Sequence, residues 1–246
     1  MYPQLDLAAG GVAISVASHA LAIAVGVAVG ATLVARRAAA ERRIPIVVAL
    51  VAVVGLAGSH ALFAALHGGS LAGWTGGLMS TGGVAAGLVA TAIAARTTRI
   101  RFRVLLDALA PGALVALAIG RIGCFLGGCC FGAPTALPWG VVFPELGPPA
   151  RHPLQLYSAA GDALVAWASI VAGAPPGAAA RRASIGLGAL RFALEFLRDP
   201  ATTDRVLAGW LTLPQAASLA LVAWAFFGLR PSGGFDYGSA PEGAHG

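Results

Sequence analysis

Gly-Arg-Ile-Gly-Cys-Phe-Leu-Gly-Gly-Cys-Cys-Phe-Gly, residues 120–132, joins an apolar run to a turn-rich loop. Arg121 stands at the end of that run, and the three cysteines of the chain, Cys124, Cys129 and Cys130, follow it among glycines. An arginine at the centre of a membrane helix costs roughly 2.5–3.5 kcal/mol on insertion scales, so it marks a candidate functional site. We therefore expect the rest of the chain to be the scaffold that holds this segment.

The composition indicates a membrane protein. Of 246 residues, 58% are hydrophobic and 11% are charged, whereas ordinary soluble domains carry about 25% charged residues. The net charge of +6 comes from arginines alone, because the chain has no lysine, and most of them lie in short segments between apolar runs. That distribution is typical of residues that orient a protein in a bilayer. We expect a lipid bilayer as a partner and no nucleic acid.

The sequence predicts seven membrane helices, because several apolar runs reach the roughly 18 residues that cross a bilayer. The predicted helices span residues 11–35, 44–66, 76–95, 104–120, 155–173, 183–197 and 211–229. Gly26 and Gly30 form a small-residue face that favours close helix contact. The predicted fold class is an all-α polytopic membrane protein. Residues 1–230 would form a single domain, and residues 231–246, rich in Gly, Ser and Pro, would be a disordered cytoplasmic tail.

The arginines of the connecting segments predict the orientation. Segments 36–43 and 96–103 hold four each and segment 181–182 holds two, whereas the connection after the second helix has none. The positive-inside rule then puts the odd-numbered loops and the C-terminus in the cytoplasm and the N-terminus outside. The long loop 121–152 would lie on the outer face and be partly re-entrant. Non-helical backbone at membrane depth requires cover by protein or a wet cavity.

Two arginines on different helices predict an anion site. Arg191, Glu195 and Arg198 fall at i, i+4 and i+7 on one helical stripe, and Arg191 lies roughly 10 Å deeper than Arg198. Guanidiniums from separate helices, Arg121 and Arg191, can clamp a phosphate through forked hydrogen bonds. The alternative is that Arg191 pairs with Glu195, or extends to a lipid headgroup.

A second cluster follows Pro153, which can begin the fifth helix. His152, Gln155 and Tyr157 surround this start. They are candidates for substrate contacts, although the same residues can simply cap and anchor a helix at the interface, where tyrosine is common.

The cysteines have three interpretations. They form a disulfide, bind a metal, or line a pocket as small polarisable residues. An odd number allows one disulfide and one free thiol. Cys124, Cys129 and Cys130 are one ligand short of a closed zinc site unless His152 joins them. We therefore expect no metal and no cofactor.

Four motifs follow one another across the second half of the chain. They are Gly120-Arg121-x-Gly123-x-Phe125; Gly132-x-Pro134-Thr135-x-x-Pro138-Trp139-Gly140; Arg151-His152-Pro153-x-Gln155-x-Tyr157; and Gly188-x-x-Arg191-Phe192-x-x-Glu195-Phe196-x-Arg198-x-Pro200, with Leu211-Thr212 and Gln215 after it. In this order they resemble the bacterial prolipoprotein diacylglyceryl transferase family. The resemblance covers about residues 76–229, and it implies the same seven-helix topology with the N-terminus outside.

The resemblance implies a monomeric, multi-pass enzyme of the bacterial cytoplasmic (inner) membrane. Such an enzyme moves a diacylglyceryl group from phosphatidylglycerol to the lipobox cysteine thiol of a preprolipoprotein and releases glycerol phosphate. Arg121 and Arg191 would be catalytic, because they would bind the anionic leaving group. The expected substrate-binding residues are His19, Thr81, Gly120, Gly123, Cys124, His152, Gln155, Tyr157, Glu195 and Arg198.

The chain departs from the family pattern at three places. The family's usual Gly-Asn-Phe-x-Asn-x-Glu after the arginine is replaced by the cysteine-containing segment that begins at Gly123. The position of a histidine implicated in catalysis aligns with Thr81, and a tyrosine of the first helix corresponds to His19. These changes leave two alternatives. One is a transferase of the same fold that uses another anionic lipid or acceptor, and the other is a membrane thiol–disulfide protein.

Overall fold

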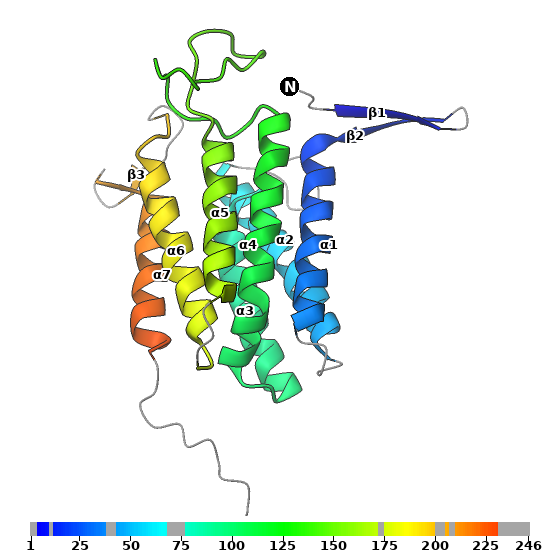
Figure 1. The fold of residues 1–246 in the computed structure, drawn as a ribbon, viewed down its shortest axis with the longest axis vertical. Coiled ribbons are helices and arrows are strands. Elements are labelled where there is room, and N and C mark those ends of the chain that lie inside the picture. Colours follow the sequence, from blue (N-terminus) through cyan, green and yellow to red (C-terminus); the bar gives the residue numbers. More distant parts are fainter. Residues whose placement is uncertain are drawn as a thin grey trace, which may run out of the picture.

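The computed structural model describes residues 4–9, 12–37, 43–67, 77–171, 175–199, 205–206 and 210–230. Within these residues, seven helices form one bundle (Figure 1). They are α1 Ser18–Arg37, α2 Ile44–His67, α3 Ser80–Thr98, α4 Phe102–Leu126, α5 Leu154–Val171, α6 Ala178–Glu195 and α7 Leu213–Gly228. Of the described helices, α1, α2, α4 and α5 are long and apolar enough to cross a membrane. The predicted tail, 231–246, lies outside the described residues.

Two antiparallel hairpins accompany the helices. Strands β1 (Gln4–Ala9) and β2 (Val12–Ala17) pair from Gln4↔Ala17 to Ala9↔Val12, and β3 (Arg205–Val206) pairs with β4 (Leu211–Thr212). The prediction of a helix from residue 11 was therefore wrong, since α1 begins at Ser18. The sequence of β2, Val-Ala-Ile-Ser-Val-Ala, places a β-branched residue at every second position, which is the strand period.

Helices α4 and α6 also have boundaries that differ from the prediction. Helix α4 continues to Leu126, so Arg121 and Cys124 lie on a helix and not in the loop that was expected to begin at residue 121. Helix α6 ends at Glu195, so Arg198 lies beyond the stripe on which it was expected. It also begins earlier than expected, because the Ala-rich start favours a helix. Asp107 of α4 caps that start, accepting hydrogen bonds from the backbone N–H groups of Gly177 (2.5 Å) and Ala180 (2.8 Å).

Helix α7 starts with a capping box. The side chain of Thr212 accepts a hydrogen bond from the backbone N–H of Gln215 at 3.3 Å, and the Gln215 side chain accepts one from the backbone N–H of Thr212 at 3.1 Å. This reciprocal pair satisfies two donors that a helix N-terminus otherwise leaves free. Both residues belong to the last of the sequence motifs, so that part of the motif has a structural function.

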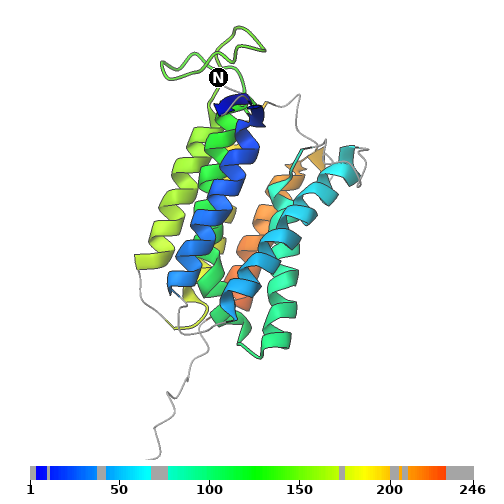
Figure 2. The ribbon, with the colours of Figure 1, turned by 90° about the vertical axis from the view of Figure 1, so that its right-hand side faces the viewer.

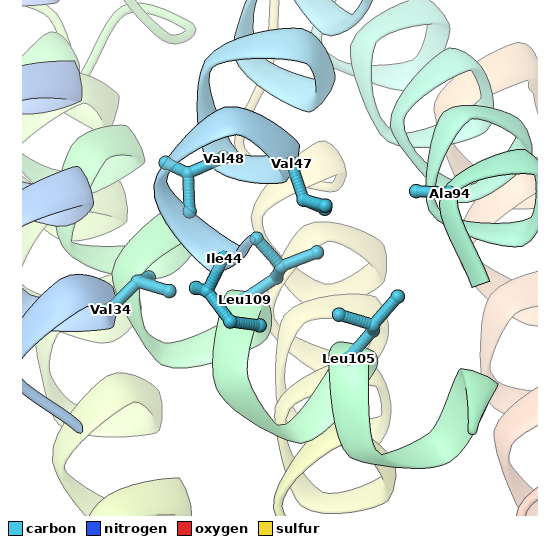
Figure 3. Packing of buried hydrophobic residues seen from close by; sticks show 7 residues of the cluster. All are labelled: Val34, Ile44, Val47, Val48, Ala94, Leu105 and Leu109. Atoms are coloured by element: carbon cyan, nitrogen blue, oxygen red, sulfur yellow. The ribbon is translucent and has the colours of Figure 1, made fainter. Parts of the chain in front are cut away.

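The helices pack in two close pairs. Helix α1 lies against α4, where a Cβ atom on Gly26 would come within 2.7 Å of the carbonyl oxygen of Ala116. The predicted small-residue face of α1 is thus confirmed. Helices α2 and α3 form the second pair, which Figure 2 shows set apart from α1, α4 and α5. At one end of the bundle a buried cluster joins the two pairs (Figure 3). It consists of Val34, Ile44, Val47, Val48, Ala94, Leu105 and Leu109.

Candidate active site

A cavity of about 380 Å³ lies between the two helix pairs, with further wall residues from α6 and α7. Its wall on α4 runs from Leu106 to Cys124, roughly 27 Å at the helical rise of 1.5 Å per residue. Aliphatic side chains and glycines make up most of the lining. Val34, Val48 and Leu109 of the buried cluster line the end remote from Arg121. The shape and chemistry of this cavity suit hydrocarbon chains.

The polar end of the cavity is formed by Ser80, Arg121, Cys124 and Cys130. Leu117, Arg121 and Cys124 lie at i, i+4 and i+7 on α4, so they share one face of this helix. Along that face an apolar side chain is followed by the guanidinium and then by the thiol. Arg121 donates a weak hydrogen bond from Nη2 to the hydroxyl of Ser80, at 3.5 Å. In the described part of the chain no salt bridge involves Arg121. Its charge is thus available to a ligand.

Arg191 lies close to Arg121 but faces a different interface. It follows Leu187, a cavity residue, by one turn of α6. Its Nη2 lies 3.2 Å from Oδ2 of Asp162, and its Nη1 donates a hydrogen bond to the hydroxyl of Ser158 at 3.4 Å. The charges of Arg191 and Arg121 act on one another. The structure therefore brings the two arginines together, with Arg121 in the cavity wall and Arg191 between α5 and α6.

The alternative pairing of Arg191 with Glu195 is wrong. Glu195 pairs with Arg198, whose Nε lies 3.1 Å from Oε2 of the carboxylate. Arg198 also forms a β-bridge with Gly132, which fastens the long loop to the segment after α6. Glu195 and Arg198, both expected to bind substrate, are therefore engaged with each other in this structure.

The cysteine loop, residues 127–132, begins where α4 ends at Leu126. The backbone N–H of Cys129 donates to the carbonyl of Cys124 at 3.1 Å, and Cys130 has a φ of 61°, in the left-handed region. The three thiols are free, and their Sγ atoms all lie within 4.8 Å of one another. Hydrogen bonds from Cys124 and Cys129, together with the charges of Arg121 and Arg198, lower the pKa of the Cys130 thiol.

Helix α5 supports this loop. Gln155 is fully buried, and its Nε2 donates to the carbonyl oxygen of Cys129. Tyr157 accepts a hydrogen bond from the indole N–H of Trp139 at 2.8 Å, and its hydroxyl lies 3.5 Å from Nδ1 of His152. These contacts match the structural alternative raised for the residues around Pro153: they anchor the loop over the end of α5.

The other expected substrate-binding residues lie around the same end of the bundle. At Gly123 a Cβ atom would collide with the Cβ of Ala22 and lie 3.0 Å from the Cα of His19, whereas at Gly120 it would meet only Ile23, at 3.8 Å. His19 is exposed beside this crossing of α1 and α4. Thr81 is half-buried in the first turn of α3, where its neighbour Ser80 lines the cavity.

Asp162 is the site residue that the sequence analysis missed. It is fully buried and forms the ion pair with Arg191. A signal was present, because Asp162 is the only charged residue of the predicted helix 155–173. A carboxylate inside an apolar helix marks a functional or paired position.

These features define a class: a membrane-type helical bundle with an apolar cavity that ends in an arginine and thiols. The family model for prolipoprotein diacylglyceryl transferase matches residues 8–230. The chain therefore belongs to the prolipoprotein diacylglyceryl transferase family.

Curated relatives carry the name phosphatidylglycerol–prolipoprotein diacylglyceryl transferase. The protein of Cupriavidus pinatubonensis is 38% identical over 165 residues, which cover 62% of this chain and 60% of the relative. That of Nitratidesulfovibrio vulgaris strain Miyazaki F is 40% identical over 153 residues, covering 60% and 58%. That of Teredinibacter turnerae is 40% identical over 154 residues, covering 61% and 54%. The chain thus spans less than two thirds of the length of these relatives.

Proposed function

We propose that this protein transfers a diacylglyceryl group from phosphatidylglycerol to the lipobox cysteine thiol of a preprolipoprotein and releases glycerol phosphate. Support comes from the family and from the names of the curated relatives. One observation carries the proposal: a weakly partnered arginine, Arg121, ends a cavity of about 380 Å³ whose wall is otherwise mainly apolar. Such a site fits a molecule with an anionic head and an apolar, hydrocarbon part.

The chemistry needs an anion-binding group where charge develops. The acceptor sulfur attacks the glyceryl carbon that carries the phosphate ester, a C–S bond forms, and the C–O bond to phosphate breaks. The electron pair stays on the phosphate oxygen of the leaving glycerol phosphate, and the thiol proton passes to solvent. A guanidinium beside that oxygen stabilises the transition state, because its charge is fixed before the reaction starts. Arg121 takes this role, and Arg191, held in its ion pair with Asp162, lies next to it as support.

We also infer the orientation and location of the protein. Arginines gather where α1, α3 and α7 end and α2, α4 and α6 begin. At this end Arg43 donates to the carbonyl of Thr98 at 3.0 Å, and Arg103 donates to those of Arg230 (2.9 Å) and Gly228 (3.1 Å). By the positive-inside rule we infer that this end is cytoplasmic. We propose that the protein is a monomeric, seven-helix protein of the bacterial inner membrane. The cysteine loop is then on the outer side, with part of it in the interface.

A transfer assay tests this proposal. Purified protein in micelles of phosphatidylglycerol and detergent is given a peptide with a lipobox cysteine, and the lipidated peptide is measured by mass spectrometry. We expect product with the wild type and a loss of about 10²–10³-fold in rate with Arg121→Ala, since an arginine that stabilises the leaving charge has that order of effect.

The matched control is Arg96→Ala, which removes an exposed arginine from the last turn of α3, at the opposite end of the bundle. It should keep the wild-type rate. Wild-type activity in Arg121→Ala would remove Arg121 from the reaction. Phosphatidic acid, cardiolipin and phosphatidylethanolamine are tested as donors in parallel. Product from one of these and none from phosphatidylglycerol would contradict the proposed substrate.

A further inference from the structure

The three cysteines form a cluster that the binding of a lipid does not explain. Their Sγ atoms all lie within 4.8 Å of one another. Around a tetrahedral zinc ion, Zn–S bonds of about 2.3 Å place the sulfur atoms about 3.8 Å apart. An inward shift of roughly 1 Å therefore turns Cys124, Cys129 and Cys130 into three ligands of one such ion.

The backbone gathers these sulfurs by specific contacts. Cys124 lies half-buried in the last turn of α4, and the chain folds back so that the N–H of Cys129 reaches the Cys124 carbonyl. Cys130 adopts a left-handed φ of 61°, a conformation that residues with a side chain rarely take. Gln155 fixes the Cys129 carbonyl from α5. The cluster is thus held in place by the protein before any ligand binds.

The position of the cluster gives it access to the reaction. Cys124 and Cys130 line the cavity beside Arg121, whereas Cys129 is exposed and does not line it. Three thiolates around a divalent cation leave one net negative charge, and Arg121 and Arg198 both act electrostatically on Cys130. Among the described residues, this group of potential metal ligands contains the three thiols and no fourth side chain. Three protein ligands with an open position are the arrangement of reactive, not structural, zinc sites.

We propose that Cys124, Cys129 and Cys130 bind a thiophilic divalent cation of the zinc class, and that the fourth coordination position, open to the cavity, takes the acceptor thiol. The second half of this proposal rests on the proposed function. A thiol that coordinates such a cation is deprotonated. The acceptor thiol gives its proton to solvent and stays nucleophilic as a metal-bound thiolate. Its sulfur then forms the C–S bond while the C–O bond to phosphate breaks. This supplies the acceptor activation that the altered family positions leave unassigned.

Metal analysis of the purified wild-type protein tests the first half. We expect about one zinc ion per chain, lost with Cys129→Ser and with Cys130→Ser. Replacement of zinc by cobalt should give the sulfur-to-cobalt charge-transfer band of a thiolate site. The absence of metal from the wild type, with a pair of cysteines found joined as a disulfide by mass spectrometry under non-reducing conditions, would overturn the proposal. Thermal unfolding of each variant shows whether it remains folded.

A matched pair of peptides tests the second half on the cobalt protein. A lipobox peptide with cysteine should shift the cobalt d–d bands, and the same peptide with serine in place of cysteine should not. Identical spectra with the two peptides would overturn the role in acceptor activation. Chelation of zinc should lower the transfer rate at least tenfold, and added zinc should restore it. Full activity without metal would also overturn that role.

The design separates this proposal from the proposed function. Arg121→Ala should lose transfer and yet keep zinc and the response of cobalt to the cysteine peptide. The wild type could fail to use phosphatidylglycerol while the cobalt spectrum still responds to that peptide. In that case the metal site is supported and phosphatidylglycerol is rejected as the lipid donor. If transfer proceeds in Cys129→Ser at the wild-type rate, the lipid function stands and the role of the metal in acceptor activation falls.

Discussion

The regions around Arg121 and Arg191 contain the same functional group in opposite settings. Arg121 lies on α4 in the cavity wall, half-buried, with a 3.5 Å contact to Ser80. Arg191 lies on α6, where its side chain is 15% exposed and contacts Asp162, whose own side chain is fully buried. The two arginines are close enough for their charges to interact. One guanidinium is therefore available to a ligand, and the other is already neutralised by the protein.

This difference gives the two arginines different functions: Arg121 can bind a ligand, and Arg191 stabilises the structure around it. A ligand phosphate competes with water and one serine for Arg121, but it has to compete with a buried carboxylate for Arg191. Removal of a paired charge from a buried site leaves its partner uncompensated, which is costly. We therefore expect substitutions in the Arg191 region to affect stability first, and substitutions at Arg121 to affect the reaction first.

The largest effect on stability is expected for Asp162→Ala. It leaves the Arg191 guanidinium without its carboxylate in an interface that is largely closed to water, and breaking a buried pair in this way costs about 3–5 kcal/mol. Thermal unfolding in detergent should show the loss. The double variant Asp162→Ala/Arg191→Met should recover much of it, because no unpaired charge remains. A single variant as stable as the wild type would show that Arg191 does not depend on Asp162.

Gly123→Ala should have the next largest effect, because it disturbs the helix end that carries Arg121. The added methyl group would collide with Ala22 on α1, and overpacking of this kind costs typically 1–3 kcal/mol. Gly120→Ala, one turn earlier on the same helix, is the matched control, since its methyl group meets only Ile23, at 3.8 Å. Thermal unfolding of the two variants under the same conditions measures the difference. Equal melting temperatures would mean that α1 and α4 are not in close contact at Gly123.

Much of the fold followed from the sequence, and its misses have physical causes. Apolar runs predicted the seven helices, and Gly26 with Gly30 predicted the close contact of α1. The helix expected from residue 11 was wrong because a hydrophobic count does not distinguish a strand with alternating β-branched residues from a helix. The end of α4 was also misjudged, because Arg121 was taken as a boundary, although a helix tolerates an arginine that lies in a cavity wall.

The site followed less completely from the sequence, because spacing along one helix says little about partners on another. The i, i+4 spacing suggested a pair of Arg191 with Glu195, but α5 brings Asp162 closer. The cysteines were judged against a closed zinc site with four ligands, a criterion that does not apply to a site with an open position. Only the turn after α4 reveals that the three sulfurs converge.

Arg121→Lys tests whether the reaction depends more on Arg121 than on Arg191. Lysine keeps the charge but loses the planar fork that holds a phosphate through two parallel hydrogen bonds, so we expect a loss of about tenfold in transfer rate. Arg191→Lys in the same assay is the matched variant. Its rate should change less than that of Arg121→Lys, because Asp162 already occupies the guanidinium. A larger loss at Arg191 would reverse the assignment of the two arginines.

The smallest effect is expected at the link between the long loop and α5, the helix that carries Asp162. Tyr157→Phe removes the acceptor for the indole N–H of Trp139, a 2.8 Å hydrogen bond in an exposed setting, and should cost about 0.5–1 kcal/mol of stability. The double-mutant cycle with Trp139→Phe isolates this bond: the second substitution should add little once the first is present. Additive losses in thermal unfolding would mean that the two side chains stabilise the loop independently. In that case the loop above Arg121 is not tied through this pair to the helix that holds Arg191.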